Sequence, residues 1–496
     1  MNGNLYQRFP DLIQRSDRTA LIVEEGEPFS FAALAALSGR LMAVLREAGA
    51  GPGARVAVKV DKSIAALALY LACLRLGAIY LPLNPAYTPG ETAYILEDAE
   101  PALFVHDPEE AVASPCASHS LDAAGQGSLM AAARQAPACD DVAAVDENDI
   151  AAILYTSGTT GRPKGAMLSH GNLASNAATL AAAWQFSADD ILLHALPLFH
   201  AHGLFVAVNV SLTVGSTMFF LPRFEAERVL AHLPRATVYM GVPTHYARLL
   251  ASPGLSLAAT AHMRLFVSGS APLTPTAFAA FAARTGHQIL ERYGMTETVM
   301  NCSNPYAGPR RPGSVGPPLP GIEVRVGDEE GTPVPPGAVG ILEVRGPNVF
   351  KGYWRNPEKT AQVFRADGFF ITGDLARIDA TGAVHLVGRV GDMIITGGLN
   401  VYPREVEDQL NRLPGVAEAA VIGVPHPDFG EAVVALIVGD AGGEAGLIAA
   451  LRAHLAGYKL PKRVIAVEAL PRNAMGKVEK ARLRAAYRDL FSAAAT

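Results

Sequence analysis

The feature that most restricts the fold of this chain is the run at residues 156–165, which reads TSGTTGRPKG. It follows an apolar run of strand length at residues 150–155. Its three glycines let the backbone bend through positive φ and approach a ligand closely. Successive N–H groups, four hydroxyls and a lysine would then converge on one anion, which predicts a phosphate cradle. The lysine spacing is not that of the G-x-x-x-x-G-K-[ST] loop, and a solvated glycine-threonine hairpin is the competing interpretation.

Composition limits the class of protein. A chain of 496 residues is too long for one hydrophobic core, so two or more domains are expected. Its 50 % hydrophobic and 18 % charged residues are typical of a globular protein. The formal net charge of -6 argues against non-specific nucleic-acid binding. Its four cysteines have no CxxC or metal-binding spacing, which favours a reducing compartment over a disulfide framework.

Neither a signal peptide nor a membrane span is expected. The first ten residues lack an apolar core segment. The longest apolar stretch, residues 64–83, is interrupted by Arg75 and Gly77 and predicts a buried helix followed by a strand. We therefore expect a cytoplasmic monomer or homodimer with small-molecule substrates and with neither nucleic acid nor membrane as a partner.

The order of apolar patterns predicts an α/β protein. Up to residue 150 and again over 170–272, strand-like runs alternate with helical periodicity, which is typical of parallel sheets covered on both faces. Residues 109–145 lack a pattern and are expected to form a surface segment. From about residue 313, short runs between Gly and Pro turns predict a small β-barrel or sandwich. The last hundred residues predict a small α+β domain. The expected boundary separates an N-terminal domain, residues 1–390, from a C-terminal domain, residues 391–496.

Five further motifs occur in order with the glycine-rich run. They are LPLFH at 196–200, YGMTET at 293–298, TGDL at 372–375, GRVGDMI at 388–394 and PRNAMGK at 471–477. Each alone is weak, but the six together, spread over nearly the whole chain, resemble the adenylate-forming superfamily of acyl-CoA synthetases, nonribosomal adenylation domains and luciferases. The resemblance implies an N-terminal domain of two α/β sheet subdomains plus the barrel, and a mobile C-terminal lid.

The resemblance implies a two-step reaction that needs ATP, Mg²⁺ and coenzyme A. A carboxylate attacks the α-phosphate of ATP, giving an acyl-adenylate and pyrophosphate, and the thiol of coenzyme A then displaces AMP. Catalysis by positioning and charge stabilisation suffices, in agreement with the lack of a G-x-S-x-G nucleophile motif. The catalytic residues that it implies are His200, Thr296, Glu297 and Lys477. Competing interpretations are a helix-terminal acid for Glu297 and a surface lysine for Lys477.

The same resemblance implies the nucleotide site. Asp374 would accept both ribose hydroxyls, although an ordinary turn aspartate is the alternative, and Tyr293 would lie near adenine. Glu297 and Thr160 would hold Mg²⁺ shared with phosphates. The implied ATP-binding residues are Thr156, Ser157, Gly158, Thr159, Thr160, Lys164, Ser268, Gly269, Ala271, Pro272, Glu291, Tyr293, Gly294, Met295, Asp374 and Arg389.

The segments implied for domain rotation and coenzyme A binding lie near the C-terminus. Gly391 and Asp392 stand at the hinge, where many relatives carry Asp or Lys in place of the glycine. The implied coenzyme A residues are Gly397, Gly398, Leu399, Tyr402, Lys459 and Lys462. For the two lysines, a solvated basic patch is an equal alternative.

Arg292 indicates the acid. A buried arginine is costly unless paired, so a second carboxylate on the substrate would suit it, unless Arg292 points away toward Glu291 or Glu297. The surrounding sequence is similar to malonyl-CoA synthetases, which implies an acyl pocket of Arg292, His202, Ala201, Met300 and Ser268. Here Val299 follows Thr298, where those enzymes often have asparagine, and methylmalonate is a possible second substrate. The alternatives are a ligase for another short-chain acid and an enzyme that loads a carrier protein.

Overall fold

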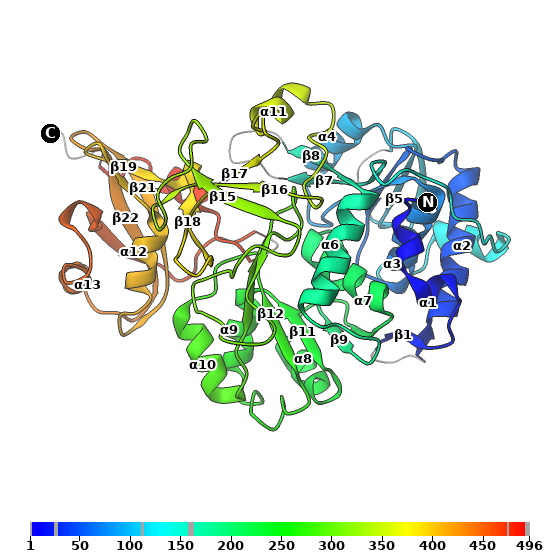
Figure 1. Cartoon of the computed structure of the whole chain (residues 1–496), viewed down its shortest axis with the longest axis horizontal. Helices are drawn as coiled ribbons and strands as arrows, with labels where there is room; N and C mark the ends of the chain where they lie inside the picture. The colour runs from blue at the N-terminus through cyan, green and yellow to red at the C-terminus, as the bar shows by residue number, and fades with distance from the viewer. Residues whose placement is uncertain (1, 24–27, 111–113, 157–162, 474–475, 492–496) are drawn as a thin grey trace.

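The computed structural model describes residues 2–23, 28–110, 114–156, 163–473 and 476–491. Within these residues the strands form four sheets. The N-terminal residues lie at one end of the long axis and the C-terminal sheet at the other (Figure 1). No helix of the described residues is long and apolar enough to cross a membrane. The expected α/β fold is confirmed, with sheets that are mixed rather than wholly parallel.

The first sheet has the order β6-β5-β3-β4-β7-β8 and is parallel except for β8. The unpatterned segment 109–145, which was expected at the surface, supplies edge strand β6 and helix α5. Both are short, and β6 is half exposed, so their apolar pattern is weak. The elements are β3 Arg55–Lys59, β4 Ile79–Pro82, β5 Leu103–His106, β6 Ala117–Ser120, β7 Ile150–Thr156, β8 Lys164–Ser169, α4 Pro89–Ala99 and α5 Ser128–Gln135.

The second sheet has the order β14-β13-β12-β11-β9-β10-β1-β2, with antiparallel pairing only at its two edges. Helices α8, α9 and α10 cover one face. The strands are β1 Thr19–Ile22, β2 Phe29–Ser30, β9 Ile191–His194, β10 Thr217–Phe220, β11 Val238–Gly241, β12 Leu265–Ser268, β13 Leu290–Tyr293 and β14 Cys302–Ser303. The helices on that face are α8 Ala226–His232, α9 Pro243–Ala251 and α10 Pro275–Thr285.

Helices packed between these two sheets form the largest core. The expected buried helix at 64–76 is confirmed as α3: Ser63 caps its N-terminus through a bond from the Ala66 N–H, and Gly77 ends it at φ 72°. The side-chain cap and the left-handed glycine define the two ends of α3, and strand β4 follows directly after the glycine. The helices of this region are η1 Leu5–Arg8, α1 Pro10–Ile13, α2 Phe31–Glu47, α3 Ile64–Leu76, α6 His170–Ala183, π-helical η2 His202–Val208 and α7 Asn209–Val214.

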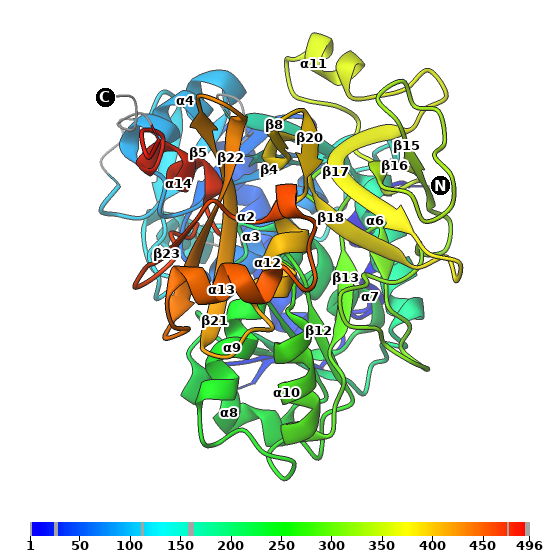
Figure 2. The same ribbon diagram turned by 90° about the vertical axis from the view of Figure 1, so that its left-hand side faces the viewer.

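The two remaining sheets follow along the chain. The expected small β-rich part is a four-stranded antiparallel sheet, β15-β16-β17-β18. The C-terminal sheet, β20-β19-β22-β21 with β23 beside β22, has separate cores under α12–α13 and α14 (Figure 2). The elements are β15 Glu323–Gly327, β16 Gly340–Arg345, α11 Pro357–Gln362, β17 Phe370–Ile378, β18 Val384–Arg389, β19 Ile394–Thr396, β20 Leu399–Val401, α12 Pro403–Leu410, β21 Val416–His426, β22 Gly430–Gly439, α13 Glu444–Leu451, β23 Arg463–Ala466 and α14 Lys480–Ala486. The domain boundary at residue 390 stays a prediction.

Candidate active site

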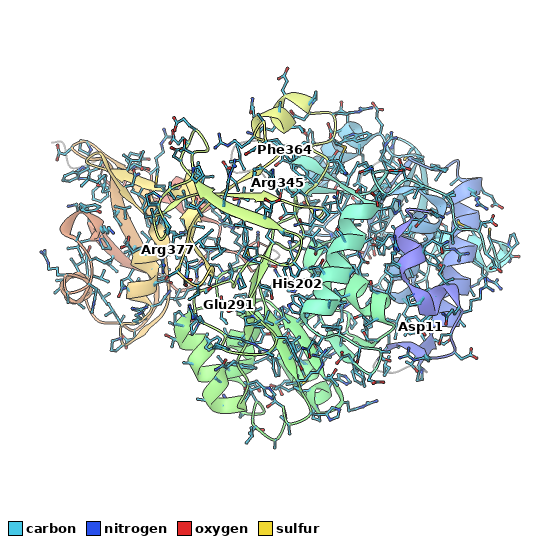
Figure 3. All side chains as sticks on the ribbon, viewed as in Figure 1. Asp11, His202, Glu291, Arg345, Phe364 and Arg377 are labelled. Atoms are coloured by element: carbon cyan, nitrogen blue, oxygen red, sulfur yellow. The ribbon has the colours of Figure 1, made fainter. Side chains whose placement is uncertain are left out.

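One group of the predicted residues lies where the parallel strands of the eight-stranded sheet end. β12 ends at Ser268, β13 ends at Tyr293 directly after Arg292, and β9 leads toward His200 and His202. Ligands of open α/β sheets bind at this edge. His202 and Glu291 both lie near the middle of the molecule in the view of Figure 3.

Arg292 is a buried cation with free hydrogen-bond donors. Only 4 % of the residue is exposed, and its Nε and Nη2 atoms have no partner among the described residues. The alternative that it pairs with Glu291 or Glu297 was therefore wrong. The guanidinium lies against Gly269, where an added Cβ would come within 2.3 Å of Cζ. Burial lowers the pKa of Arg292 to about 9, and an anionic partner would offset this cost.

Neutral histidines stand beside this guanidinium. Burial lowers the pKa of His200 to about 4 and that of His202 far below its usual value, and in both the charge of Arg292 adds to the effect. The Nε2 of His202 and the Oγ of Ser268 are buried without a partner among the described residues. The Nδ1 of His202 lies 3.4 Å from the Oγ of Ser270, which has a left-handed φ of 70°. The pocket therefore holds one positive charge and several unused polar atoms.

Asp374 lies at the centre of a second cluster. Tyr293 donates its hydroxyl to Asp374 Oδ2 at 2.5 Å, and Arg389 Nε lies 2.9 Å from Oδ1. The ion pair follows from register, because Asp374 on β17 stands opposite Arg389 on β18. Burial raises the pKa of Tyr293 well above its usual value, and the Asp374 carboxylate adds to this. The cluster joins three of the predicted nucleotide residues in one contact.

Tyr353, a residue that sequence reasoning missed, contacts Glu297 and also lies near Lys164. Tyr353 donates its hydroxyl to Glu297 Oε1 at 3.0 Å, and Lys164 Nζ lies 5.8 Å from the centre of the Tyr353 ring. Burial raises the pKa of Glu297. One buried carboxylate suits Mg²⁺ that takes its other ligands from phosphates and water. The only available signal for Tyr353 was the aromatic run at 350–354, which is equally typical of core packing.

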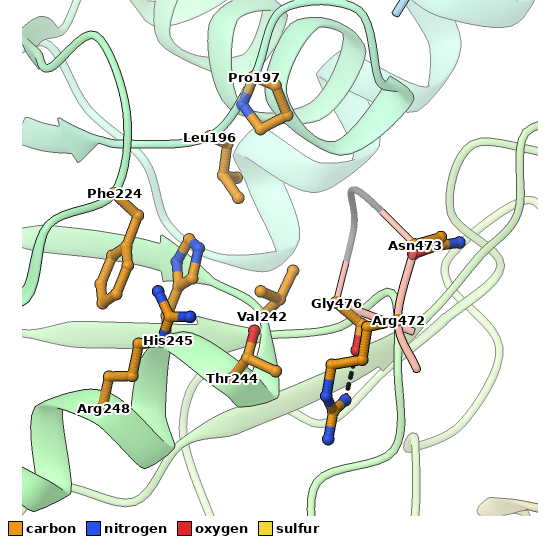
Figure 4. Close-up of a pocket in the computed structure, with 10 residues that line it drawn as sticks. All are labelled: Leu196, Pro197, Phe224, Val242, Thr244, His245, Arg248, Arg472, Asn473 and Gly476. Atoms are coloured by element: carbon orange, nitrogen blue, oxygen red, sulfur yellow. Dashed lines mark hydrogen bonds between the residues drawn. The ribbon is translucent and has the colours of Figure 1, made fainter. Parts of the chain in front are cut away.

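Lys477, from the C-terminal part of the chain, lies in the electrostatic field of Asp374 and Arg389. Lys477 is exposed in this arrangement. Partial desolvation, and then the charge of Arg389, lowers its pKa, and Asp374 acts in the opposite direction. The adjoining Gly476 lies against α9, where an added Cβ would come within 2.8 Å of Thr244 Oγ1. A cavity of about 260 Å³ opens between this turn and the sheet edge (Figure 4). Its lining residues are Leu196, Pro197, Phe224, Val242, Thr244, His245, Arg248, Arg472, Asn473 and Gly476.

Family profiles match most of the chain: that of the AMP-binding enzymes over residues 12–354, and that of their C-terminal domain over 405–477. The chain belongs to the AMP-binding enzyme family. It is 52 % identical to ATP-bound MatB from Rhodopseudomonas palustris, with a TM-score of 0.97, over 99 % of this chain and 100 % of that one. It is 39 % identical to a feruloyl-CoA synthase of Amycolatopsis, over 92 % and 94 % of the two chains. A malonate–CoA ligase of Arabidopsis thaliana is 34 % identical, over 88 % and 78 %.

The predicted superfamily is thereby confirmed, and this AMP-binding enzyme is an acid–thiol ligase. Membership implies the use of ATP with Mg²⁺, and of coenzyme A as co-substrate. Of the predicted residues, Ser157, Gly158, Thr159 and Thr160 lie outside the described residues. Ala201 and Met300 are buried at 4 % and 3 % exposure, as a tight pocket wall requires. Thr296, Gly294, Met295 and Ala271 are half-buried, and Pro272 is exposed.

The predicted coenzyme A residues are not brought to the pocket. Gly397, Gly398 and Leu399 lie in the exposed β19–β20 hairpin, and Tyr402 follows it. Lys459 pairs with Glu405 at 2.6 Å, and Lys462 lies 4.6 Å from the centre of the Phe429 ring. At the predicted hinge, Asp392 pairs with Arg484 at 2.8 Å, and Gly391 does not adopt a positive φ. Roles in coenzyme A binding and rotation stay predictions.

Glu291 gives a test of the site's electrostatics. Its carboxylate accepts the N–H groups of Leu273 and Gly313, both at 3.2 Å. Burial raises its pKa to about 7, and the charge of Arg404 on α12 offsets part of this. In the unfolded chain the pKa is about 4.3. Between these values only the folded state keeps the proton, so the group removes stability as pH rises from about 4.3 to 7.

We therefore expect Glu291→Gln to gain stability relative to the unchanged enzyme as pH rises. The difference in Tm between the two proteins should shift in favour of the variant between pH 4.5 and pH 8, as measured by thermal unfolding. A difference in Tm that does not change with pH would contradict the raised pKa.

Proposed function

We propose that this enzyme ligates malonate to coenzyme A through a malonyl-adenylate, giving malonyl-CoA, AMP and pyrophosphate. The observation that carries the proposal is the buried Arg292, whose Nε and Nη2 have no partner in the described part of the chain. A feruloyl or other aromatic tail would leave this charge unpaired, at a cost of several kcal/mol. A distal carboxylate pairs it through two parallel hydrogen bonds.

The pocket wall supports a short acid. Ala201 and Met300 are buried, and the lowered pKa values of His200 and His202 keep both rings neutral, so the substrate's second carboxylate would meet one cation. Malonate fits this arrangement, and methylmalonate adds one methyl group. Acetate or propionate is the second candidate, and it would leave Arg292 unpaired.

In this proposal each cluster has one task. Lys164 and Lys477 bind phosphate oxygens, Asp374 accepts the ribose hydroxyls, and Glu297 holds Mg²⁺, which offsets the charge of the phosphates. The acid lies between Arg292 and the α-phosphate, and the enzyme contributes orientation and positive charge rather than a nucleophile. We place the reaction in the cytoplasm, where thiols such as the four free cysteines stay reduced.

The direct test compares malonate, methylmalonate, succinate, acetate and octanoate in assays of AMP and thioester formation with ATP, Mg²⁺ and coenzyme A. Malonate preferred at least about tenfold supports the proposal, since one well-placed ion pair is worth at least that factor. A preference for acetate or octanoate would discard the substrate and keep the ligase chemistry. Transfer to a carrier protein but not to coenzyme A would favour the carrier-loading alternative.

Gly269 gives a second, more local test. A Cβ at this position would come within 2.3 Å of the Arg292 guanidinium and displace it. We expect Gly269→Ala to raise the KM for malonate about tenfold or more, because a displacement near 1 Å is enough for such an effect. Gly51→Ala is the control, since an added Cβ there meets no atom within 4 Å. Unchanged malonate kinetics in folded Gly269→Ala would argue against Arg292 as the anchor.

A further inference from the structure

Lys62 is a buried amine that has no carboxylate partner among the described residues. The residue is 9 % exposed and directly precedes the Ser63 cap of α3. Lys59, the other buried lysine nearby, pairs with Glu110 at 2.6 Å, whereas Lys62 has no acidic partner within the described ranges. Its Nζ instead lies 2.6 Å from His194 Nδ1, 2.8 Å from the His194 carbonyl and 4.3 Å from the centre of the Phe220 ring. Buried lysines are rare, and none of the roles described above accounts for this one.

The geometry fixes which way the hydrogen bonds run. His194 Nε2 lies 2.8 Å from the carbonyl oxygen of Gly203, and because a carbonyl only accepts, Nε2 carries the proton. In a neutral imidazole Nδ1 is then an acceptor, and Lys62 donates to it. Burial, and then the charge of Lys62, lowers the pKa of His194, which keeps the ring neutral. The chain of donors therefore runs from Lys62 to His194 to the Gly203 carbonyl.

Gly203 belongs to the first turn of the π-helical segment His202–Val208. It packs closely against the backbone at Pro197, because an added Cβ would come within 1.9 Å of the Pro197 carbonyl oxygen. Its neighbour His202 is buried and lies in the field of Arg292. π-helical turns are uncommon and are frequently found at functional sites. Any shift of the Gly203 peptide therefore moves the histidine that faces the acid pocket.

We propose that Lys62 and His194 are positioning residues for the acid pocket, holding the first π-helical turn so that His202 faces Arg292 and the bound acid. The inference deepens the proposed function and rests on it, because it assigns the pair a task in binding the acid that Arg292 receives. Neither residue touches the substrate, and both act through Gly203.

The test is steady-state kinetics of Lys62→Met, which keeps the side-chain length and removes the donor. We expect the KM for malonate to rise about tenfold and the KM for ATP to stay within about twofold, because only the acid pocket loses its support. The variant should fold, since an apolar side chain replaces a buried amine that has no counter-charge. Lys59→Met is the matched control. It loses a buried lysine of the same region that has no link to His202, so the ratio of the KM for malonate to the KM for ATP should stay unchanged.

His194 supplies the second arm. Glutamine places an N–H₂ near the position of Nε2 and keeps a donor for Gly203, whereas leucine has none. We expect His194→Gln to retain malonate affinity closer to the unchanged enzyme than His194→Leu does. Equal losses in the two variants, an unchanged malonate KM in Lys62→Met, or a parallel rise of the KM for malonate and ATP would overturn the inference. If the enzyme prefers another acid, the proposed function fails, and the same ratios measured with that acid still decide the role of the pair.

Discussion

Arg292→Ala is expected to lower kcat/KM for malonate by about 10²–10³-fold, because truncating one member of a buried charge pair costs about 2–5 kcal/mol. The slow reaction with acetate should change little, since acetate has no second carboxylate for the guanidinium to bind. The measurement is AMP release with malonate, methylmalonate, succinate, acetate and octanoate, in the unchanged enzyme and in the variant. The selectivity for dicarboxylates, rather than the overall rate, is the quantity that should collapse.

Arg75 is a matched control because it is buried to a similar degree but fully bonded. It is 2 % exposed and donates to the carbonyl oxygens of Ala35, Cys139 and Asp141 and to the hydroxyl of Ser38. Removing it leaves buried carbonyls unpaired, so Arg75→Ala should lower Tm and leave acid selectivity unchanged.

Arg292 differs from Arg75 in its hydrogen bonds and therefore in the expected effect of its removal. Its Nε and Nη2 bond to no described residue, so the free enzyme bears the cost of burying a charge. Arg292→Met, which fills the space, is therefore expected to keep or raise Tm while losing malonate use. A malonate KM that survives in the alanine variant, or loss of acetate and malonate use in equal measure, would contradict the assignment.

Sequence patterns were sufficient for the parts of the fold that depend on local order. Strand-like runs alternating with helical periodicity predicted the α/β class, including strands β3, β4, β5, β7, β9, β10, β11 and β12. The interrupted run at 64–83 correctly indicated a helix and a strand rather than a membrane span. The motifs also predicted which residues meet: Tyr293, Asp374 and Arg389 come from distant segments and lie in one cluster. Local pattern failed over 109–145, where two short, half-exposed elements have too few apolar residues to stand out.

The unpredicted parts of the site depend on tertiary contacts. The sequence around Tyr353 does not predict that its hydroxyl donates to Glu297. The sequence around Lys62 does not predict its contact with His194. The sequence left open whether Arg292 was paired, because the answer depends on which side chains surround it in the fold. The coenzyme A residues illustrate a different limit, since one arrangement of the C-terminal part places Lys477 near Asp374 and leaves the β19–β20 hairpin exposed.

Lys477→Ala is the change with the largest expected effect on the first half-reaction. The charges of Asp374 and Arg389 both act on Lys477, and we propose that its ammonium binds phosphate oxygens beside the ribose. Removing one donor that stabilises transition-state charge costs about 10²–10³-fold in rate. We expect that loss in malonate-dependent exchange of pyrophosphate into ATP. Thioester formation from supplied malonyl-adenylate and coenzyme A should be largely spared, because no pyrophosphate leaves in that step.

The control is Lys480→Ala, which removes a cation three residues further on. Lys480 pairs with Glu407 at 2.6 Å, so its loss should affect stability more than either half-reaction. Equal loss of both half-reactions in Lys477→Ala would show that the lysine supports the fold of the site rather than adenylation. Loss confined to pyrophosphate exchange would instead assign the charge of Lys477 to the first transition state, and it would mean that the arrangement described here is the one in which the adenylate forms.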